Sequence, residues 1–333
     1  MEKIISVEHI VKDFVIYEHK QGIKNSFKEL ISRDKKIVRA VDDISFEVNR
    51  GDIVGYLGTN GAGKSTTIKM MTGILKPTSG NIKVNGLSPN KDRVNLAKNI
   101  GVVFGQKCQL WWDIPLIESL NLTKYMYNIS TDEYKKNLDK FIELLDMKDF
   151  INVPVRQLSL GQRIRGEICC ALIHNPQILF LDEPTIGLDV VVKKNIRDFI
   201  HEINKEKDIT VILTTHDMDD VEKLCNNIII IDEGKKIFDN SIDVLKKEYA
   251  DYGLITYYFA SSFLSDFSSI KSMDGIQKIE SQGNKVNVYF DKKKTSTTIL
   301  SQKFFEFGNV VDFQTNNIEL SAILRNIFDK NKE

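Results

Sequence analysis

The sequence predicts an α/β fold built around a parallel β-sheet. Between residues 155 and 231, helical segments alternate with short apolar segments of strand length, which is the pattern of consecutive βαβ units. An apolar strand at residues 53–57 leads into a glycine-rich loop that helical sequence follows. Another, at residues 178–181, ends in two carboxylates, Asp182 and Glu183. In sheets of this class, such a strand end lies beside the loop.

The composition is that of a globular chain without a strong charge preference. Of its residues, 42% are hydrophobic and 28% charged. The length of 333 residues predicts one large and one small domain, and the order of predicted strands and helices places them at residues 1–241 and 242–333. Lysine plus arginine and aspartate plus glutamate both total 46, so we expect no nucleic-acid partner. No apolar run approaches the roughly 20 residues of a membrane span, and the N-terminus lacks the apolar stretch of a signal peptide. We therefore expect a chain that is not exported.

The four cysteines lie without CxxC spacing and without a histidine-rich neighbourhood. This pattern predicts neither a zinc site nor a redox pair. We expect small buried side chains in a reducing compartment at Cys108, Cys169, Cys170 and Cys225.

The N-terminal region contains strand sequence at residues 4–7 and around Phe14, followed by a lysine-rich insertion at residues 17–37. Within the insertion, apolar residues recur at helical spacing among lysines, which predicts a short basic amphipathic helix over residues 23–31. Such a helix either rests, solvated, on the domain edge or lies on lipid head groups or a membrane partner.

Residues 58–66 carry the pattern Gly-x4-Gly-Lys-Ser between a buried strand and a helix, which is the context of a phosphate-binding loop. Its glycines allow tight turns whose N–H groups point at phosphate, and the helix dipole adds positive potential. Lys64 is expected to bind the β- and γ-phosphates, and Ser65 to ligate Mg²⁺. The predicted nucleotide-binding residues of this loop are Gly58, Asn60, Gly61, Ala62, Gly63, Lys64, Ser65 and Thr66.

Asp182 and Glu183 supply the carboxylates that such a loop requires for hydrolysis. Asp182 is expected to hold Mg²⁺, directly or through water, and Glu183 to polarise the attacking water as general base. The alternative is a solvent-exposed acidic turn before Pro184. The presence of Lys64 in the same predicted sheet favours the catalytic interpretation.

Residues 158–162, Leu-Ser-Leu-Gly-Gln, resemble the signature motif of ABC ATPases, usually written LSGGQ. Gln106 resembles the Q-loop glutamine of that family, residues 187–189 its D-loop, and His216 its switch histidine. The resemblance covers residues 1 to about 240. It implies a RecA-like phosphate-loop core with a helical subdomain at about residues 107–175, and ATP with Mg²⁺ as ligands.

The resemblance also implies a composite site formed by two ATPase chains. Ser159, Gly161 and Gln162 lie where a helix opens, so that backbone N–H groups can bind a γ-phosphate held by the opposite chain. His216 would hydrogen-bond the γ-phosphate, and Gln106 would contact Mg²⁺ or the attacking water. The implied catalytic residues are Glu183, His216 and Gln106, and the implied Mg²⁺ ligands are Ser65, Gln106 and Asp182.

Two positions depart from the family pattern. Leu160 replaces the first glycine of the signature pair, from which we expect slower or unchanged hydrolysis. The aromatic residue that stacks on adenine is usually tyrosine in this family. The register here selects Phe14, with Tyr17 as the competing candidate.

The single cassette argues against other branches of the family. Only one phosphate loop and one signature occur, unlike in translation factors, and only 118 residues separate Lys64 from Asp182, too few for the coiled coil of chromosome proteins. Trp111 and Trp112 lie where transporter cassettes receive their membrane subunits. These and neighbouring segments resemble the ATPases of daunorubicin- and viologen-type drug exporters.

We therefore predict the ATP-binding and hydrolysing subunit of a membrane exporter for drugs or other small amphiphiles, at the cytoplasmic face of the membrane. Its partners would be integral-membrane permease subunits and a second ATPase chain, identical or paralogous. The competing hypothesis is a soluble ATP-driven switch that acts on ribosomes or nucleic acid through the basic insertion.

The segment after residue 241 contains no motif that carries chemistry. The order β-α-β-α-β predicts a small α+β module, with a ferredoxin-like arrangement as the candidate. We expect a linking helix at residues 242–249, strands at 254–259, 286–290 and 310–314, and helices at 298–307 and 319–327.

Overall fold

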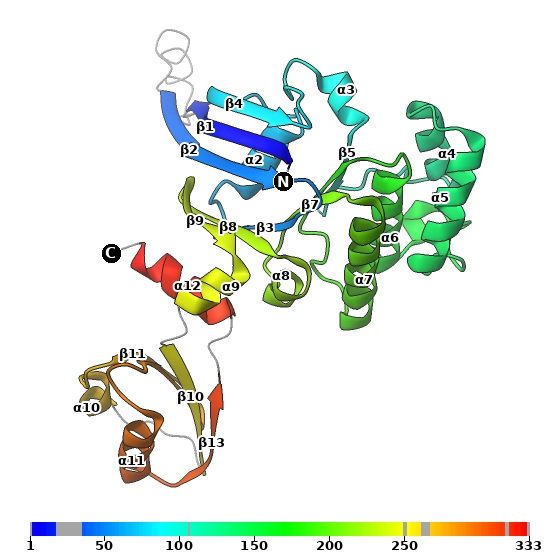
Figure 1. Cartoon of the computed structure of the whole chain (residues 1–333). Helices are drawn as coiled ribbons and strands as arrows, with labels where there is room; N and C mark the ends of the chain where they lie inside the picture. Colours follow the sequence, from blue (N-terminus) through cyan, green and yellow to red (C-terminus); the bar gives the residue numbers. More distant parts are fainter. Residues whose placement is uncertain are drawn as a thin grey trace, which may run out of the picture. The chain divides into compact units, whose positions relative to one another are not determined.

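The computed structural model describes residues 2–17, 35–105, 107–248, 252–260, 267–316 and 320–331. The chain divides into two compact units, Met1–Asn240 and Ser241–Glu333, which are described here one at a time (Figure 1). Within these described ranges, no helix is both long and apolar enough to cross a membrane.

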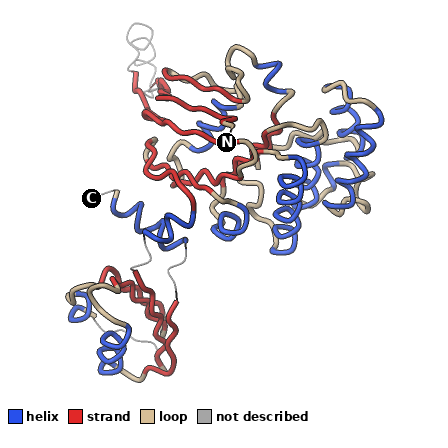
Figure 2. The backbone as a smooth tube through the Cα atoms, in the orientation of Figure 1, coloured by secondary structure: helices blue, strands red, loops and turns tan. Residues whose placement is uncertain are grey.

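The first unit contains a six-stranded sheet with strand order β5-β6-β7-β3-β8-β9. Its strands are drawn in red in Figure 2. The pairs β5–β6, β6–β7, β7–β3 and β3–β8 are parallel, which confirms the predicted parallel sheet. The central strands are apolar and buried on both faces, as parallel strands require. The strands span Ile53–Gly58 (β3), Ile100–Phe104 (β5), Ile178–Asp182 (β6), Thr210–Thr214 (β7), Asn227–Asp232 (β8) and Lys235–Ser241 (β9).

A three-stranded antiparallel sheet of order β2-β1-β4 forms the rest of the β structure in this unit. One apolar core joins it to the parallel sheet and to helix α2, with Ile10 and Ile44 on one side and Tyr56 on the other. This core fixes the helix that follows the phosphate loop against both sheets. The elements are β1 (Lys3–Tyr17), β2 (Lys35–Asn49), β4 (Ser79–Val84) and α2 (Lys64–Met71).

The N-terminal strand sequence forms one long strand where we expected two short ones. β1 stays paired with β2 across several register shifts, which bend the strand without ending it. Ile37 pairs with Val15, so both ends of the insertion expected at residues 17–37 belong to strands. The amphipathic helix expected at residues 23–31 lies outside the described residues.

Helices occupy the region expected at about residues 107–175. Helix α5 begins after Ser130, whose hydroxyl accepts a hydrogen bond from the Glu133 N–H. Its Phe141 ring meets Phe199 of α7 edge-on, with centroids 5.5 Å apart. The region contains α4 (Leu116–Met126), α5 (Thr131–Leu144), the 3-10 turn η1 (Val155–Gln157) and α6 (Leu160–Leu172). The other helices of this unit besides α2 are α3 (Arg93–Ala97), α7 (Val190–Lys207) and α8 (Met218–Leu224).

The second unit begins with α9 and contains an antiparallel sheet of order β11-β12-β10-β13. From β10 to β13 the element order is βαββαβ, which together with this strand order is the ferredoxin-like arrangement. The bounds are α9 (Ile242–Glu248), β10 (Tyr252–Phe259), α10 (Ser268–Lys271), β11 (Ile276–Gln282), β12 (Lys285–Asp291), α11 (Thr297–Phe307), β13 (Val310–Asn316) and α12 (Leu320–Lys330).

Two of these elements were absent from the sequence-based expectation. Helix α10 has only four residues, and β11 is half-exposed, so neither carries a strong apolar period.

The burial of the cysteines differs from expectation in part. Cys169 and Cys225 are buried, whereas Cys108 is exposed in the loop after β5.

Candidate active site

The phosphate loop runs from the end of β3 into α2, and its glycines are required by the backbone. Gly61 and Gly63 have φ values of 83° and 100°, in the left-handed region that glycine adopts without strain. A Cβ at Gly63 would lie 2.4 Å from the Ala40 carbonyl oxygen, and one at Gly58 would lie 2.4 Å from that of Ile231. Larger residues at Gly58 and Gly63 would push the loop away from the neighbouring strands.

Lys64 lies at the start of α2 and is almost fully buried. Its ammonium group donates hydrogen bonds to the carbonyl oxygens of Gly58, at 2.7 Å, and Thr59, at 2.9 Å. Burial lowers the pKa of Lys64, while Glu183 and Asp182 act in the opposite direction. The loop therefore holds the Lys64 ammonium group against its own carbonyl oxygens.

Asp182, the last residue of β6, accepts hydrogen bonds from two hydroxyl groups. Ser65 Oγ donates to Asp182 Oδ1 at 3.2 Å, and Thr214 Oγ1 donates to the same oxygen at 2.6 Å. Thr214 ends β7 directly opposite Asp182, so its position follows from the parallel register. Sequence reasoning did not single out Thr214, although its place at the end of a neighbouring strand was a usable signal.

Glu183 follows Asp182 and is held in an unusual conformation. Its φ is 56°, and its N–H donates to the Thr214 carbonyl at 3.0 Å. Gly105 packs against it so closely that a Cβ there would lie 2.4 Å from the Glu183 carbonyl oxygen. His216 Nε2 lies 2.6 Å from Glu183 Oε1. A left-handed non-glycine residue stores backbone strain, and such strain is concentrated at functional sites.

A pocket of about 240 Å³ opens at this strand edge. Gln106, expected beside it, lies outside the described residues. The pocket is lined by Ser65, Lys69, Ile74, Phe104, Gly105, Lys107, Asp182 and Glu183.

The signature segment forms the start of α6. Ser159 is the exposed N-cap and forms a capping box with Gln162, in which the Gln162 N–H donates to Ser159 Oγ at 3.2 Å and the Ser159 N–H donates to Gln162 Oε1 at 2.9 Å. A Cβ at Gly161 would lie 3.3 Å from Val192 of α7. Leu160 Cδ2 lies 3.3 Å from the point that a Cβ on Gly187 would occupy. Leu160, which replaces the first glycine of the signature pair, thus contacts the D-loop of its own chain.

The family model for ABC transporters matches residues 41–186. The chain is 33% identical over 234 residues to NatA, an ABC transporter ATP-binding protein of Bacillus subtilis, covering 70% of this chain and 94% of NatA. The chain is an ABC transporter ATP-binding protein. Its ATP-hydrolysing class and its fold are thereby confirmed.

Two further comparisons support this assignment. The ABC ATPase is 36% identical over 215 residues to BcrA of Bacillus licheniformis, named a bacitracin transport ATP-binding protein, covering 64% of this chain and 69% of BcrA. The dimeric cassette MJ0796, solved with ADP and phosphate, superposes with a TM-score of 0.60 at 26% identity, covering 72% of this chain and 98% of that one.

The D-loop of the ABC ATPase is held by hydrogen bonds at Thr185 and Asp189, and apolar side chains beside it are exposed. Asp189 caps α7 by accepting hydrogen bonds from two N–H groups of the first turn, each at 3.0 Å. Thr185 donates to the buried Asp220 at 2.5 Å, and the buried Arg197 contacts the same carboxylate at 2.6 Å. Apolar side chains are exposed at Ile186, between Thr185 and Asp189, and at Val190 and Val191, directly after Asp189.

The expected adenine platform lies where β1 and β2 meet the phosphate loop. Phe14 pairs with Val38, two residues along β2 from the Ala40 carbonyl that packs against Gly63. The ring of Phe14 is 36% exposed, and Lys12 Nζ lies 5.2 Å from its centroid. Tyr17, the competing candidate, ends β1 three residues further from the loop.

The loop between β5 and α4 presents aromatic side chains. Trp111 is 43% and Trp112 49% exposed, and the guanidinium of Arg163 lies 5.7 Å from the ring centroid of Trp112. A groove of about 490 Å³ beside this loop includes Trp111, Met126 of α4 and His174. Large apolar side chains at a groove mouth are typical of protein contact surfaces.

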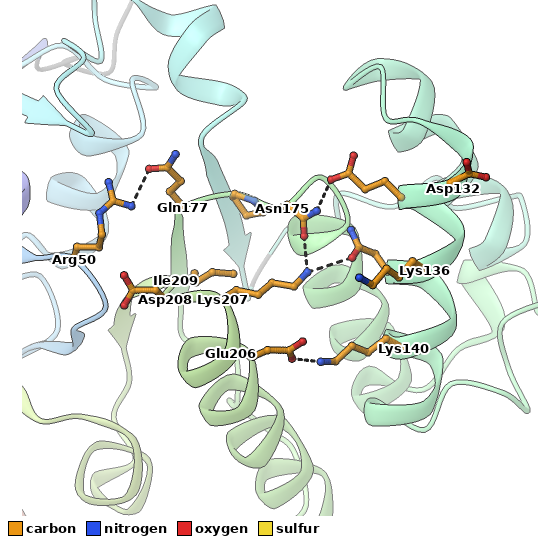
Figure 3. Close-up of a pocket in the computed structure, with 13 residues that line it drawn as sticks. Arg50, Asp132, Lys136, Lys140, Asn175, Gln177, Glu206, Lys207, Asp208 and Ile209 are labelled. Atoms are coloured by element: carbon orange, nitrogen blue, oxygen red, sulfur yellow. Dashed lines mark hydrogen bonds and ion pairs between the residues drawn. The ribbon is translucent and has the colours of Figure 1, made fainter.

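A separate pocket of about 570 Å³ lies at the opposite edge of the parallel sheet, lined by residues that precede β3, β6 and β7 and by residues of α5 (Figure 3). Lys207, the last residue of α7, donates to Asn137 Oδ1 at 3.2 Å and to Asn175 Oδ1 at 2.5 Å. Burial lowers the pKa of Lys207. Lys140 of α5 pairs with Glu206 of α7. These contacts tie α5 to the end of α7.

Proposed function

We propose that this ABC ATPase powers an exporter of drugs or other small amphiphiles from the cytoplasmic face of the membrane. One strand edge brings together a buried cation, a carboxylate with two hydroxyl groups and a carboxylate paired with histidine. That combination supports binding of a nucleoside triphosphate and attack of water on its terminal phosphate.

The proposed catalytic residues act through geometry that the chain already holds. Glu183 is the general base that accepts the proton of the attacking water, and His216, 2.6 Å away, fixes the carboxylate in place. Lys64 binds the β- and γ-phosphates beside the N–H groups of residues 58–66. Gln106 completes the proposed site, and Phe14 is proposed to stack on adenine.

The donor set at the strand end fits a magnesium ion. Ser65 Oγ and Asp182 Oδ1 are hard oxygen donors 3.2 Å apart, the ligand chemistry that Mg²⁺ prefers. We propose Ser65, Asp182 and Gln106 as its contacts. When bound with the nucleotide, Mg²⁺ would neutralise charge on the β- and γ-phosphates.

A second ATPase chain supplies the proposed other half of the site. Ser159 is exposed in a single chain, as are the apolar side chains of Val190 and Val191 at the start of α7. Closure of two chains would cover that surface and bring Ser159, Gly161 and Gln162 to the γ-phosphate bound by the opposite chain. The MJ0796 cassette is itself dimeric.

The proposed partners that span the membrane are permease subunits, which contact the groove beside Trp111 and Trp112. Both rings are about half exposed, as an aromatic anchor for a partner would be before docking. Movement of the loop between β5 and α4 on ATP binding and hydrolysis would then be transmitted to the permease.

A pull-down with Glu183→Gln tests the proposal, because the variant should bind ATP without completing hydrolysis. Loaded with ATP and added to detergent-solubilised membranes of the source cells, it should recover a polytopic protein. The matched control carries Trp111→Ala and Trp112→Ala in addition and should lose that protein. Recovery of ribosomes in place of a membrane protein would favour the soluble-switch hypothesis.

The direction of transport needs a separate measurement. Among the relatives, BcrA is named for bacitracin transport and MetN of Lactobacillus acidophilus, 29% identical over 311 residues, for methionine import. Cells in which Glu183→Gln replaces the wild-type chain should retain more of a fluorescent cationic amphiphile than wild-type cells. Lower retention in the variant cells would contradict export.

A further inference from the structure

The second unit leaves one edge of its sheet open. β13 pairs with β10 on one side, and no strand in the described ranges pairs with its other side. Residues 311–315 are all exposed, with Val311 at 62% and Phe313 at 43%. An edge strand presents unpaired N–H and C=O groups, and together with exposed apolar side chains these form a template for another strand.

The apolar surface extends from β13 onto the neighbouring helix. Phe313 lies opposite Tyr257, whose ring stacks on Phe304 of α11 with centroids 4.3 Å apart, so Phe313 is on the helix-covered face of the sheet. Phe305 of α11 is 51% exposed, and its ring centroid lies 6.1 Å from that of Phe313.

The opposite edge of the same sheet is protected by charge. On β11, Lys278 pairs with Glu280 at 3.0 Å, and Arg325 of α12 contacts the same carboxylate at 3.1 Å. Charged side chains on an edge strand oppose pairing with another chain. β13 carries one charged residue, Asp312, among its seven. The two edges therefore differ, and only β13 is suited to pairing.

We propose that β13 pairs antiparallel with β13 of a second copy of this chain, joining two four-stranded sheets into one. The strand is complementary to itself when the pairing is centred on Phe313. Asp312 then faces Gln314, and Val311 faces Thr315, so no like charges meet. The two Phe313 rings meet at the two-fold axis, and the Phe305 side chains extend the same apolar surface on both sides.

Self-pairing of this kind closes after two chains. An antiparallel contact of a strand with itself is isologous, so it consumes both open edges and leaves none for further copies. It uses no residue of the nucleotide site and needs no nucleotide. The inference thus goes beyond the proposed function and predicts two chains held together before ATP binds.

The mass of the full-length chain in nucleotide-free buffer tests the contact. By light scattering after gel filtration, the wild-type chain of 38.1 kDa should have twice that mass. The double substitution Val311→Lys with Phe313→Lys should have the mass of one chain, because it places four cations at the pairing surface. The matched control, Val94→Lys, changes an exposed valine of α3 in the first unit and should remain a dimer. A monomeric wild type, or a double variant that remains dimeric, would overturn the proposal.

Cross-linking tests the register independently of any loss of folding. Phe313→Cys would place the two introduced sulfurs opposite each other, within reach of a disulfide. Val311→Cys would place them four residues apart along the paired strands, about 13 Å. Only the first should give a covalent dimer that thiols reverse. Cross-linking of both variants to the same extent through the introduced cysteines would overturn the register, as would none in either.

The contact is separable from the composite ATP site. Adding Glu183→Gln to the Val311→Lys, Phe313→Lys background should give a monomer without nucleotide and a dimer with ATP. A dimer in both conditions would overturn the β13 contact. A monomer in both would contradict the two-chain ATP site while leaving the β13 contact supported.

Discussion

His216 Nε2 lies 2.6 Å from Glu183 Oε1, and the backbone on which Glu183 sits is held by Thr214 from the neighbouring strand. The carboxylate is thus fixed at both its backbone and its side chain. A base held in this way loses little conformational freedom when it meets the attacking water.

His216→Ala should therefore lower kcat by about 10²-fold, and Glu183→Gln by about 10²- to 10⁴-fold, measured as phosphate release at saturating ATP. Because the two residues act as a unit, the double variant should be no slower than Glu183→Gln alone. His201→Ala, an exposed histidine of α7, is the control and should keep wild-type turnover. Additive losses in the double variant would show that His216 acts separately from Glu183.

Leu160→Gly should raise kcat, by up to about tenfold, because it removes a side chain that rests against Gly187 at the start of the signature helix α6. The same change should lower the free energy of unfolding by about 1 kcal/mol, since glycine is unfavourable in a helix. Leu160→Ala keeps the helix propensity and serves as control. Slower turnover in both variants would show that the leucine supports the signature.

Arg197→Met should lower the free energy of unfolding by about 3–5 kcal/mol, measured by urea denaturation. The loss arises because Asp220, fully buried, would keep the Thr185 hydroxyl as its one side-chain partner among the described residues. ATPase activity should fall as well, because Thr185 anchors the segment after Glu183. Lys223→Met breaks the exposed Lys223–Asp219 pair, 2.7 Å apart, and should cost less than about 1 kcal/mol. Similar losses in both variants would contradict the buried pair's role.

His174 should make the folded chain less stable in weak acid. Burial lowers the pKa of His174 to about 4, while an unfolded histidine titrates near about 6.5. Between these values the unfolded chain binds a proton that the folded chain does not, so stability decreases as the pH falls from about 6.5 to about 4. The slope is up to about 1.4 kcal/mol per pH unit. His174→Gln should show a shallower slope in urea titrations, with His201→Gln as the control that behaves like wild type. An unchanged slope in His174→Gln would assign the pH dependence elsewhere.

Short-range sequence patterns predicted the residues proposed to bind phosphate, because a loop between a strand and a helix fixes Lys64 and Ser65 within a few positions. Asp182 and Glu183 were equally accessible as the polar end of an apolar strand. The roles proposed for them stay predictions until the variants above are measured. The contact between Leu160 and Gly187, and the pairing of Arg197 with Asp220, join segments whose approach depends on packing. No local pattern encodes such contacts.

Helix α7 begins at Val190, directly after the D-loop residue Asp189, and its 18 residues end at Lys207, which donates hydrogen bonds to Asn137 and Asn175. At 1.5 Å per residue it is a stiff rod about 27 Å long, so tilting it by about 5° at one end displaces the other by about 2 Å. That displacement equals the difference between a made and a broken hydrogen bond. α7 can therefore act as a lever arm. A small rearrangement at its first turn would make or break the contacts of Glu206 and Lys207 with α5 at the far edge of the sheet.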